Sequence, residues 1–478
     1  MASSTNKVVA NTFYQIFGRL FSAAETLVAT YFLARALGTS GYGDLTIILT
    51  FTGIFSVISD FGINVIIVRE WSLEALRIKK EFTQLVVFRV VLALFLTVLA
   101  SVVVLVLSHF SSAYNPLVVK GILVGLLLVT GQSLYYSCTA IFQTTFSYVK
   151  SFLASIWGNL GALVLIIVGI VLHVTFLKLV LLLVVGSLLP TAISLFYVRT
   201  YFDFTGFKLD LKFWKRIFIA SLPTGLGLII NTLYTSADRV MLSLLSTTTA
   251  IGLYGLSYKI FENILVIPNF FMNASYPVVV AHRAESADRV SVTVQKLFDA
   301  LCLAVFPIVT LGVILSVPIL NLIGGAKFVV GAPVLVLLFL GLPIYFISPL
   351  FRWLIIVEKK EWWLPFIYAG GLISNVLLNL YLIRRFDILG AALANAISEL
   401  LVLVIIFIVL RRALNLKLRF NYLVIAVLGS LFMAPFVNLF KDWYFVGPII
   451  LGGIAYFLAV YLLTRGQVLK SLRQLISK

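Results

Sequence analysis

Residues 83–107 read TQLVVFRVVLALFLTVLASVVVLVL, and this stretch decides the fold class of the chain. Arg89 is its one charged residue, and most other positions are Val, Leu, Ala or Phe. An α-helix rises about 1.5 Å per residue, so the stretch would extend about 37 Å. The hydrocarbon core of a bilayer is about 30 Å thick. We therefore expect residues 83–107 to form a helix that spans a membrane.

The rest of the 478-residue chain repeats this pattern from end to end. Hydrophobic residues make up 62% of the chain and charged residues 11%, whereas soluble domains carry roughly 45–50% and 25%. So much apolar surface needs lipid as part of its solvent. We predict an all-α polytopic membrane protein with about fourteen transmembrane helices. The apolar runs lie near 11–36, 42–67, 83–107, 118–144, 151–173, 177–198, 217–243, 250–280, 291–316, 332–357, 362–383, 388–410, 421–440 and 445–464.

The formal net charge of +18 is distributed unevenly among the loops. If the N-terminus is cytoplasmic, the basic clusters at 77–80, 199–216 and 411–419 all fall on the cytoplasmic side. The positive-inside rule favours this orientation. We therefore expect a multi-pass protein of the cytoplasmic cell membrane with both termini in the cytoplasm. Its basic loops would face anionic membrane lipids, and no nucleic acid is expected as a partner.

Two glycine-rich turns, Ala34–Gly43 and Ala250–Gly255, each open the second span of a six-span bundle. Six spans per unit would give two pseudo-symmetric lobes with the same orientation, related by an axis along the membrane normal. The longest polar segment separates them. The predicted organisation is an N-lobe of six spans at 1–198, a cytoplasmic linker at 199–216, a C-lobe of six spans at 217–410, and two further helices with a cytoplasmic tail at 411–478.

Several ionisable residues lie inside the predicted spans, where a charge is costly unless it meets a partner or faces a cavity. Lys259 and Glu262 are three residues apart on one helix, so we interpret them as a structural pair. Arg19 has no acid three or four residues away, and Glu25 follows six residues later. Arg19 therefore needs an acid across a helix interface or an anion in a cavity. The other such residues are Asp60, Arg89, Arg352 and Glu399.

Six segments of the chain resemble the oligosaccharide/polysaccharide flippase family. That family belongs to the same superfamily as the multidrug and toxin exporters and the lipid II flippases. The segments are Leu33–Asp44, Ser59–Ile63, Ser236–Val240, Gly252–Gly255, Asn375–Ile383 and Gly390–Glu399. The resemblance implies a two-lobed transporter that moves a lipid-linked sugar from the cytoplasmic to the outer leaflet by alternating access.

The resemblance also implies a cationic cavity for the pyrophosphate of a polyprenyl-linked oligosaccharide. Arg19 matches a cavity arginine of the lipid II branch, but Glu25 stands where that branch has a second basic residue, which argues against lipid II as the cargo. Arginine binds phosphate through its planar fork. We predict Arg19, Arg89 and Arg352 as phosphate-binding residues. Glu25, Asp60 and Glu399 are candidates for ion coupling or charge pairing.

Two other functions stay open at this point. A cation- or proton-coupled small-molecule exporter would use Glu25, Asp60 or Glu399 for the coupling ion. A membrane polysaccharide polymerase would need a sizeable outer loop with paired charges, and the outer loops are short. We expect no cofactor or metal site, because Cys138, Cys302 and the histidines do not cluster, and the short outer loops argue against an enzyme. The expected partners are the lipid-linked oligosaccharide, membrane lipids and other polysaccharide-assembly proteins.

Overall fold

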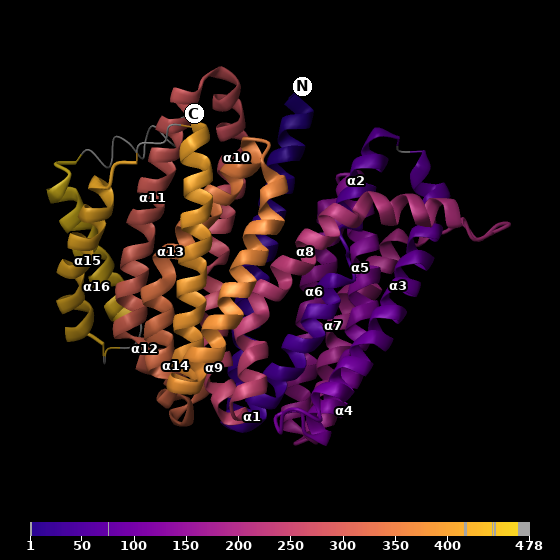
Figure 1. Cartoon of the computed structure of the whole chain (residues 1–478), viewed down its shortest axis with the longest axis horizontal. Helices are drawn as coiled ribbons and strands as arrows, with labels where there is room; N and C mark the ends of the chain where they lie inside the picture. Colours follow the sequence, from indigo (N-terminus) through magenta and orange to yellow (C-terminus); the bar gives the residue numbers. More distant parts are fainter. Residues whose placement is uncertain (1, 75, 415–417, 442, 444–445, 467–478) are drawn as a thin grey trace. The chain divides into compact units, whose positions relative to one another are not determined.

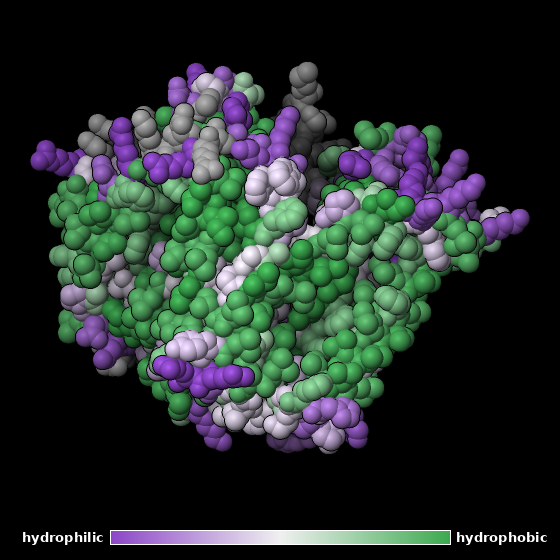
Figure 2. Space-filling view, in the orientation of Figure 1, coloured by the Kyte–Doolittle hydropathy of each residue, from purple (hydrophilic) through white to green (hydrophobic). Residues whose placement is uncertain are grey.

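The computed structural model describes residues 2–74, 76–414, 418–441, 443 and 446–466. Within these ranges it places the side chains except those of 2–16, 19, 20, 287, 412 and 413. The described residues form helices and connecting turns, without any strand (Figure 1). The prediction of an all-α chain is confirmed. Hydrophobic side chains cover the visible flanks of the helices, and hydrophilic ones gather toward helix ends (Figure 2).

The chain forms two compact units, Met1–Gly255 and Leu256–Lys478. A cluster of buried hydrophobic side chains that includes Trp71, Phe82 and Phe142 forms a core of unit 1. Helix α9 (Thr248–Ile264) crosses the boundary between the units. The helices of unit 1 that precede it are α1 (Ala2–Ile58), α2 (Ile63–Leu73), α3 (Arg77–Leu107), α4 (Pro116–Gly125), α5 (Leu127–Thr144), α6 (Tyr148–Val171), α7 (Phe176–Val198), η1 (Arg199–Tyr201) and α8 (Leu211–Leu245).

Unit 2 is built around α11 and α13, which pack on each other. The last two helices pack on α11 (Figure 1), and the Tyr456 hydroxyl donates a hydrogen bond to the Leu303 carbonyl over 2.7 Å. The helices of unit 2 that follow α9 are α10 (Val266–Glu285), α11 (Ala287–Ile314), α12 (Ser316–Gly324), η2 (Ala326–Gly331), α13 (Ala332–Val357), η3 (Glu361–Trp363), α14 (Leu364–Leu414), α15 (Asn421–Leu439) and α16 (Val446–Leu463).

Twelve helical segments of the described residues are long and apolar enough to cross a membrane. Two of them contain a sharp kink: Gly38 in α1 has φ 66°, and Asp387 in α14 has φ 48°. These kinks separate the predicted runs 11–36 and 42–67, and the runs 362–383 and 388–410. Because each kink joins two helices, the 57 and 51 residues amount to about 80 Å of helical rise in total, more than twice the hydrocarbon thickness of about 30 Å. The count of fourteen crossings stays a prediction.

The two glycine-rich turns noted in the sequence contact each other inside unit 1. A Cβ on Gly43 would collide with the Thr248 carbonyl, and a Cβ on Gly252 would collide with the Thr39 carbonyl. The hydroxyl oxygens of Ser40 and Thr248 lie 3.1 Å apart. The contact is reciprocal, since each turn presents a glycine to the backbone of the other. Only glycine permits this close approach of the two backbones.

The predicted span 42–67 is interrupted, because α1 ends at Ile58 and α2 begins at Ile63. At the break, Phe61 has φ 47° and Gly62 has φ 69°. A left-handed conformation costs a non-glycine residue roughly 1–2 kcal/mol. The ring of Phe61 stacks on that of Phe218 in α8, with centroids 5.1 Å apart and planes 3° apart. This packing holds the strained residue in place.

The glycine contact gives a direct test. Gly43→Ala and Gly252→Ala should each lower the yield and thermal stability of the folded protein, because the added methyl group meets a rigid backbone carbonyl. Gly53→Ala in α1 is the matched control, since nothing lies within 4 Å of its Cβ position. Thermal unfolding in detergent measures the effect. Equal stability of all three variants would contradict the contact.

Candidate functional site

An ion pair in the interior of unit 1 joins the helix break to α3. The Nη2 of Arg89 donates to Oδ1 of Asp60 over 3.1 Å. The side chain of Arg89 is 0% exposed and that of Asp60 is 15% exposed. Asp60 Oδ1 also accepts a hydrogen bond from the Asn64 backbone over 3.3 Å, at the start of α2. The aspartate therefore both neutralises Arg89 and binds a backbone donor that the break exposes.

Further polar side chains surround this pair. The side-chain amide of Asn64 donates to Oε1 of Gln143 in α5 over 3.4 Å. The guanidinium carbon of Arg89 lies 6.0 Å from the centre of the Tyr136 ring. Among the described residues, Nε and Nη1 of Arg89 have no hydrogen-bond partner. Within the described part of the chain, Asp60 is thus the one acid paired with this fully buried guanidinium. A buried charge that loses its partner is strongly destabilising.

Unit 2 contains a second arginine–acid pair within the predicted spans. Arg352 in α13 donates to Oε1 of Glu399 in α14, and the guanidinium lies 5.7 Å from the centre of the Tyr368 ring. Nearby on the same two helices, the Tyr345 hydroxyl donates to Oδ1 of Asn395. Glu399 is 2% exposed, but Arg352 is 27% exposed. Arg352 therefore differs from Arg89, because part of its surface is open.

The other predicted site residues lie apart from these two pairs. Arg19 is in α1, but its side chain lies outside the described part of the structure. Glu25 is half-buried on the same helix. Lys259 Nζ donates to Oε2 of Glu262 over 3.0 Å in α9, and both side chains are half-exposed. The roles assigned to these residues, including phosphate binding by Arg19, Arg89 and Arg352, stay predictions.

The structure adds polar residues that sequence reasoning did not select. Asn64 lies one helical turn after Asp60, a spacing that could have signalled it, whereas Gln143 is brought close only by the fold. Asp44 and Asp238 are buried acids of unit 1, at 8% and 2% exposure. Asp238 accepts a hydrogen bond from the Tyr254 hydroxyl. Within the described residues, no group of three His, Cys, Asp or Glu side chains could hold a metal ion.

Buried arginine–acid pairs and an interrupted span in an all-helical chain are features of a membrane transporter. Comparisons with known proteins agree with this class. The family model of the polysaccharide biosynthesis proteins matches residues 8–283, and the chain belongs to that family. A search of curated proteins finds no match.

Solved structures share the fold at low sequence identity. The lipid II flippase MurJ in an inward closed conformation matches with a TM-score of 0.76 and 16% identity, covering 96% of this chain and 100% of that one. An inward-facing multidrug resistance transporter of the MATE family matches with a TM-score of 0.69 and 12% identity, over 83% and 94%. The multidrug transporter DinF-BH matches with a TM-score of 0.59 and 18% identity, over 88% and 96%. The chain has the fold of these flippases and transporters.

The buried pair can be tested by its effect on stability. Arg89→Gln should destabilise the protein by about 3–5 kcal/mol, because Asp60 loses its buried counter-charge. Adding Asp60→Asn should recover part of that loss. Thermal unfolding of the full chain in detergent, run as a double-mutant cycle, measures the coupling.

The control is the exposed pair of Arg77 and Glu74, next to the start of the same helix, with side chains 37% and 58% exposed. Neutralising an exposed pair changes stability by about 0–1 kcal/mol. A loss for Arg89→Gln as small as that for Arg77→Gln, or purely additive effects of the two buried substitutions, would contradict the role assigned to the pair.

Proposed function

We propose that this protein is a flippase that moves a polyprenyl-pyrophosphate-linked oligosaccharide from the inner to the outer leaflet of the cytoplasmic membrane by alternating access. The observation that carries the proposal is the match to the polysaccharide biosynthesis family over residues 8–283. Polysaccharide building blocks are assembled on lipid carriers with polar, anionic heads, and such heads cannot cross the hydrocarbon core unaided. Both termini would be cytoplasmic, with lobes at 1–198 and 217–410, a linker at 199–216 and two additional helices at 411–478.

The arginines inside the predicted spans support an anionic cargo. Arginine can bind phosphate with two parallel hydrogen bonds, which lysine cannot. Arg352 is the best-placed described candidate, because it is partly exposed and beside a tyrosine ring. We also propose, from the sequence, that Arg19 contacts the phosphate. Glu25 replaces a basic residue of the lipid II branch, so we favour a cargo other than lipid II.

The rival function is export of a small molecule coupled to a cation or proton, and the MATE-like fold makes it the second candidate. A coupling acid must exchange its ion during transport. Asp60 and Glu399 each lie in an ion pair with arginine, which favours charge pairing over ion coupling for these two. Glu25 is the third acid that the rival mechanism offers for the coupling ion.

Reconstitution of the full chain into liposomes with a fluorescent polyprenyl-pyrophosphate sugar tests the proposal. We expect the labelled lipid to exchange between leaflets faster than in protein-free liposomes. Arg352→Ala combined with Glu399→Gln removes the pair without leaving a buried carboxylate. This double variant should fold but move the lipid at least about tenfold more slowly, the equivalent of one lost interaction of about 1.4 kcal/mol in the transport barrier.

Arg385→Ala is the control, because Arg385 is an exposed arginine of α14, the helix that carries Glu399. It should transport at the wild-type rate. Failure of the wild type to exchange the labelled lipid would overturn the proposed function. Accumulation of a cationic dye driven by an imposed ion gradient, without lipid exchange, would establish the rival. A fully active Arg352→Ala/Glu399→Gln variant would remove Arg352 from the cargo site.

A further inference from the structure

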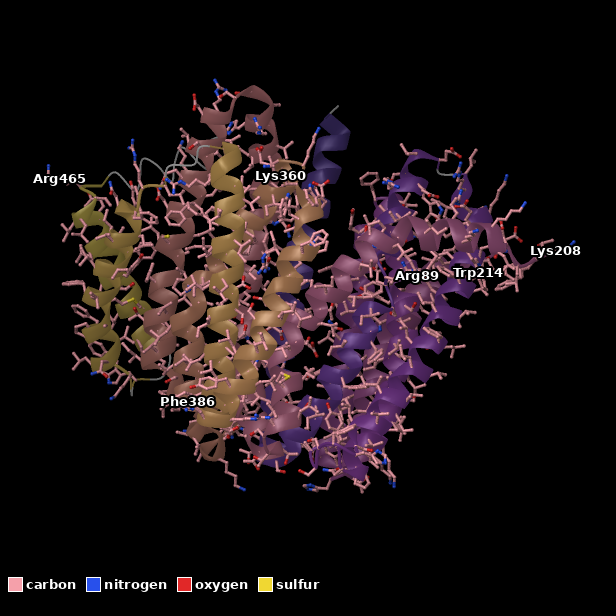
Figure 3. The ribbon with its side chains drawn as sticks, in the orientation of Figure 1. Arg89, Lys208, Trp214, Lys360, Phe386 and Arg465 are labelled. Carbon is pink, nitrogen blue, oxygen red and sulfur yellow. The ribbon has the colours of Figure 1, made fainter. Side chains whose placement is uncertain are left out.

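Residues 202–215, here called the basic segment, connect η1 to the first turn of α8 and combine apolar and basic side chains at the surface. Phe204, Leu209 and Leu211 are 67%, 57% and 66% exposed. Three lysines of the segment are also exposed, and Lys208 lies at its outer tip (Figure 3). They are Lys208, Lys212 and Lys215.

The basic segment is fixed to the bundle and is not a free tether. The side chain of Gln84 in α3 donates to the Lys208 carbonyl over 2.5 Å and accepts from the Asp210 backbone over 3.2 Å. The Asp203 backbone donates to the Thr83 hydroxyl over 2.9 Å. These three hydrogen bonds hold the segment against the first part of α3, so the fold sets where its lysines lie.

The acids of the basic segment are occupied by local hydrogen bonds. Asp203 accepts from the Thr205 backbone, and Asp210 accepts from the Phe213 backbone at the start of α8, each over 2.9 Å. The neighbouring Arg216 is bound by Glu70 and Glu81 over 3.3 and 3.0 Å. These hydrogen bonds leave both carboxylates charged, but the three lysines outnumber the two aspartates, so residues 202–215 carry a net positive charge.

In unit 2 a glutamine side chain also holds a chain segment through two hydrogen bonds to its backbone. Gln295 in α11 donates to the Arg419 carbonyl and accepts from the Arg419 backbone, both over 2.8 Å. The residue whose carbonyl accepts from the glutamine lies 124 positions later in both units, whereas the backbone donor is Asp210 in unit 1 and Arg419 itself in unit 2. Phe420, which follows Arg419, is 54% exposed. A fixed segment that pairs a basic residue with exposed apolar surface is thus built twice, once per unit.

We propose that the basic segment is a docking surface for the headgroups of anionic phospholipids. Its residues 202–210 lie directly between two candidate spans, Phe176–Tyr201 and Leu211–Leu245, and its residues 211–215 begin the second of them. The segment therefore belongs at the level where a bilayer ends. Lysines next to a membrane span attract anionic headgroups, and exposed aromatic and aliphatic side chains suit the apolar side of the same interface. A water-facing protein partner would account for the charge but not for the apolar side chains beside it.

Lipid binding by the full chain in nanodiscs tests this proposal. The nanodiscs contain equal amounts of phosphatidylglycerol and phosphatidylcholine. Native mass spectrometry counts the lipids that stay bound to the protein after the protein is released from the nanodisc. The wild type should retain phosphatidylglycerol preferentially. Substituting glutamine for Lys208, Lys212 and Lys215 should lower this preference by roughly fivefold or more, since one lysine near anionic lipid contributes about that factor.

The matched control substitutes glutamine for Lys178, Lys327 and Lys441, three exposed lysines in predicted outer loops. It removes the same charge and should keep the wild-type preference. Gln84→Ala leaves all lysines in place but frees the segment, and it should lower the preference as well. Unchanged lipid preference in the Lys208/Lys212/Lys215 variant, or an equal loss in the control, would overturn the proposal.

Discussion

A charge inside a bilayer must be met by an opposite charge, and the pair of Arg89 and Asp60 satisfies this constraint in unit 1. Arg89 is fully buried, and Asp60 lies in the turn that interrupts the second predicted span. The interruption places Asp60 beside α3 and exposes the Asn64 backbone donor that its carboxylate binds. The strained residue Phe61, the left-handed Gly62, the Asn64–Gln143 contact and the stack of Phe61 on Phe218 all belong to the same local arrangement.

The two units satisfy the same constraint in different ways. Unit 1 encloses its arginine completely, whereas unit 2 leaves Arg352 partly exposed over Tyr368 while enclosing Glu399. A fully enclosed pair favours structural specificity, and a partly open guanidinium keeps donors near a surface that an anion can reach. On this difference we propose a structural role for Arg89 and a cargo role for Arg352.

Hydropathy predicted the helical spans, because a run of apolar residues is a local property of the sequence. The glycine-rich turns were also visible, although only the fold shows that Gly43 and Gly252 approach each other's backbone. The break at residues 59–62 was not predicted, since Phe61 carries no sequence signal for a left-handed conformation. The partners of Arg89 and Arg352 stand 29 and 47 residues away, so helix periodicity could not identify them.

Detecting the contact between Arg89 and Asp60 in a lipid bilayer is the most direct test of this account. Solid-state NMR of the full chain, with ¹⁵N-labelled arginine and ¹³C-labelled aspartate, can detect the dipolar coupling between the guanidinium and the carboxyl carbon. A separation of 3.1 Å between Nη2 and Oδ1 brings the carboxyl carbon close enough for a detectable coupling, which disappears in the Arg89→Gln variant. A wild-type spectrum without any coupling that depends on Arg89 would contradict the account.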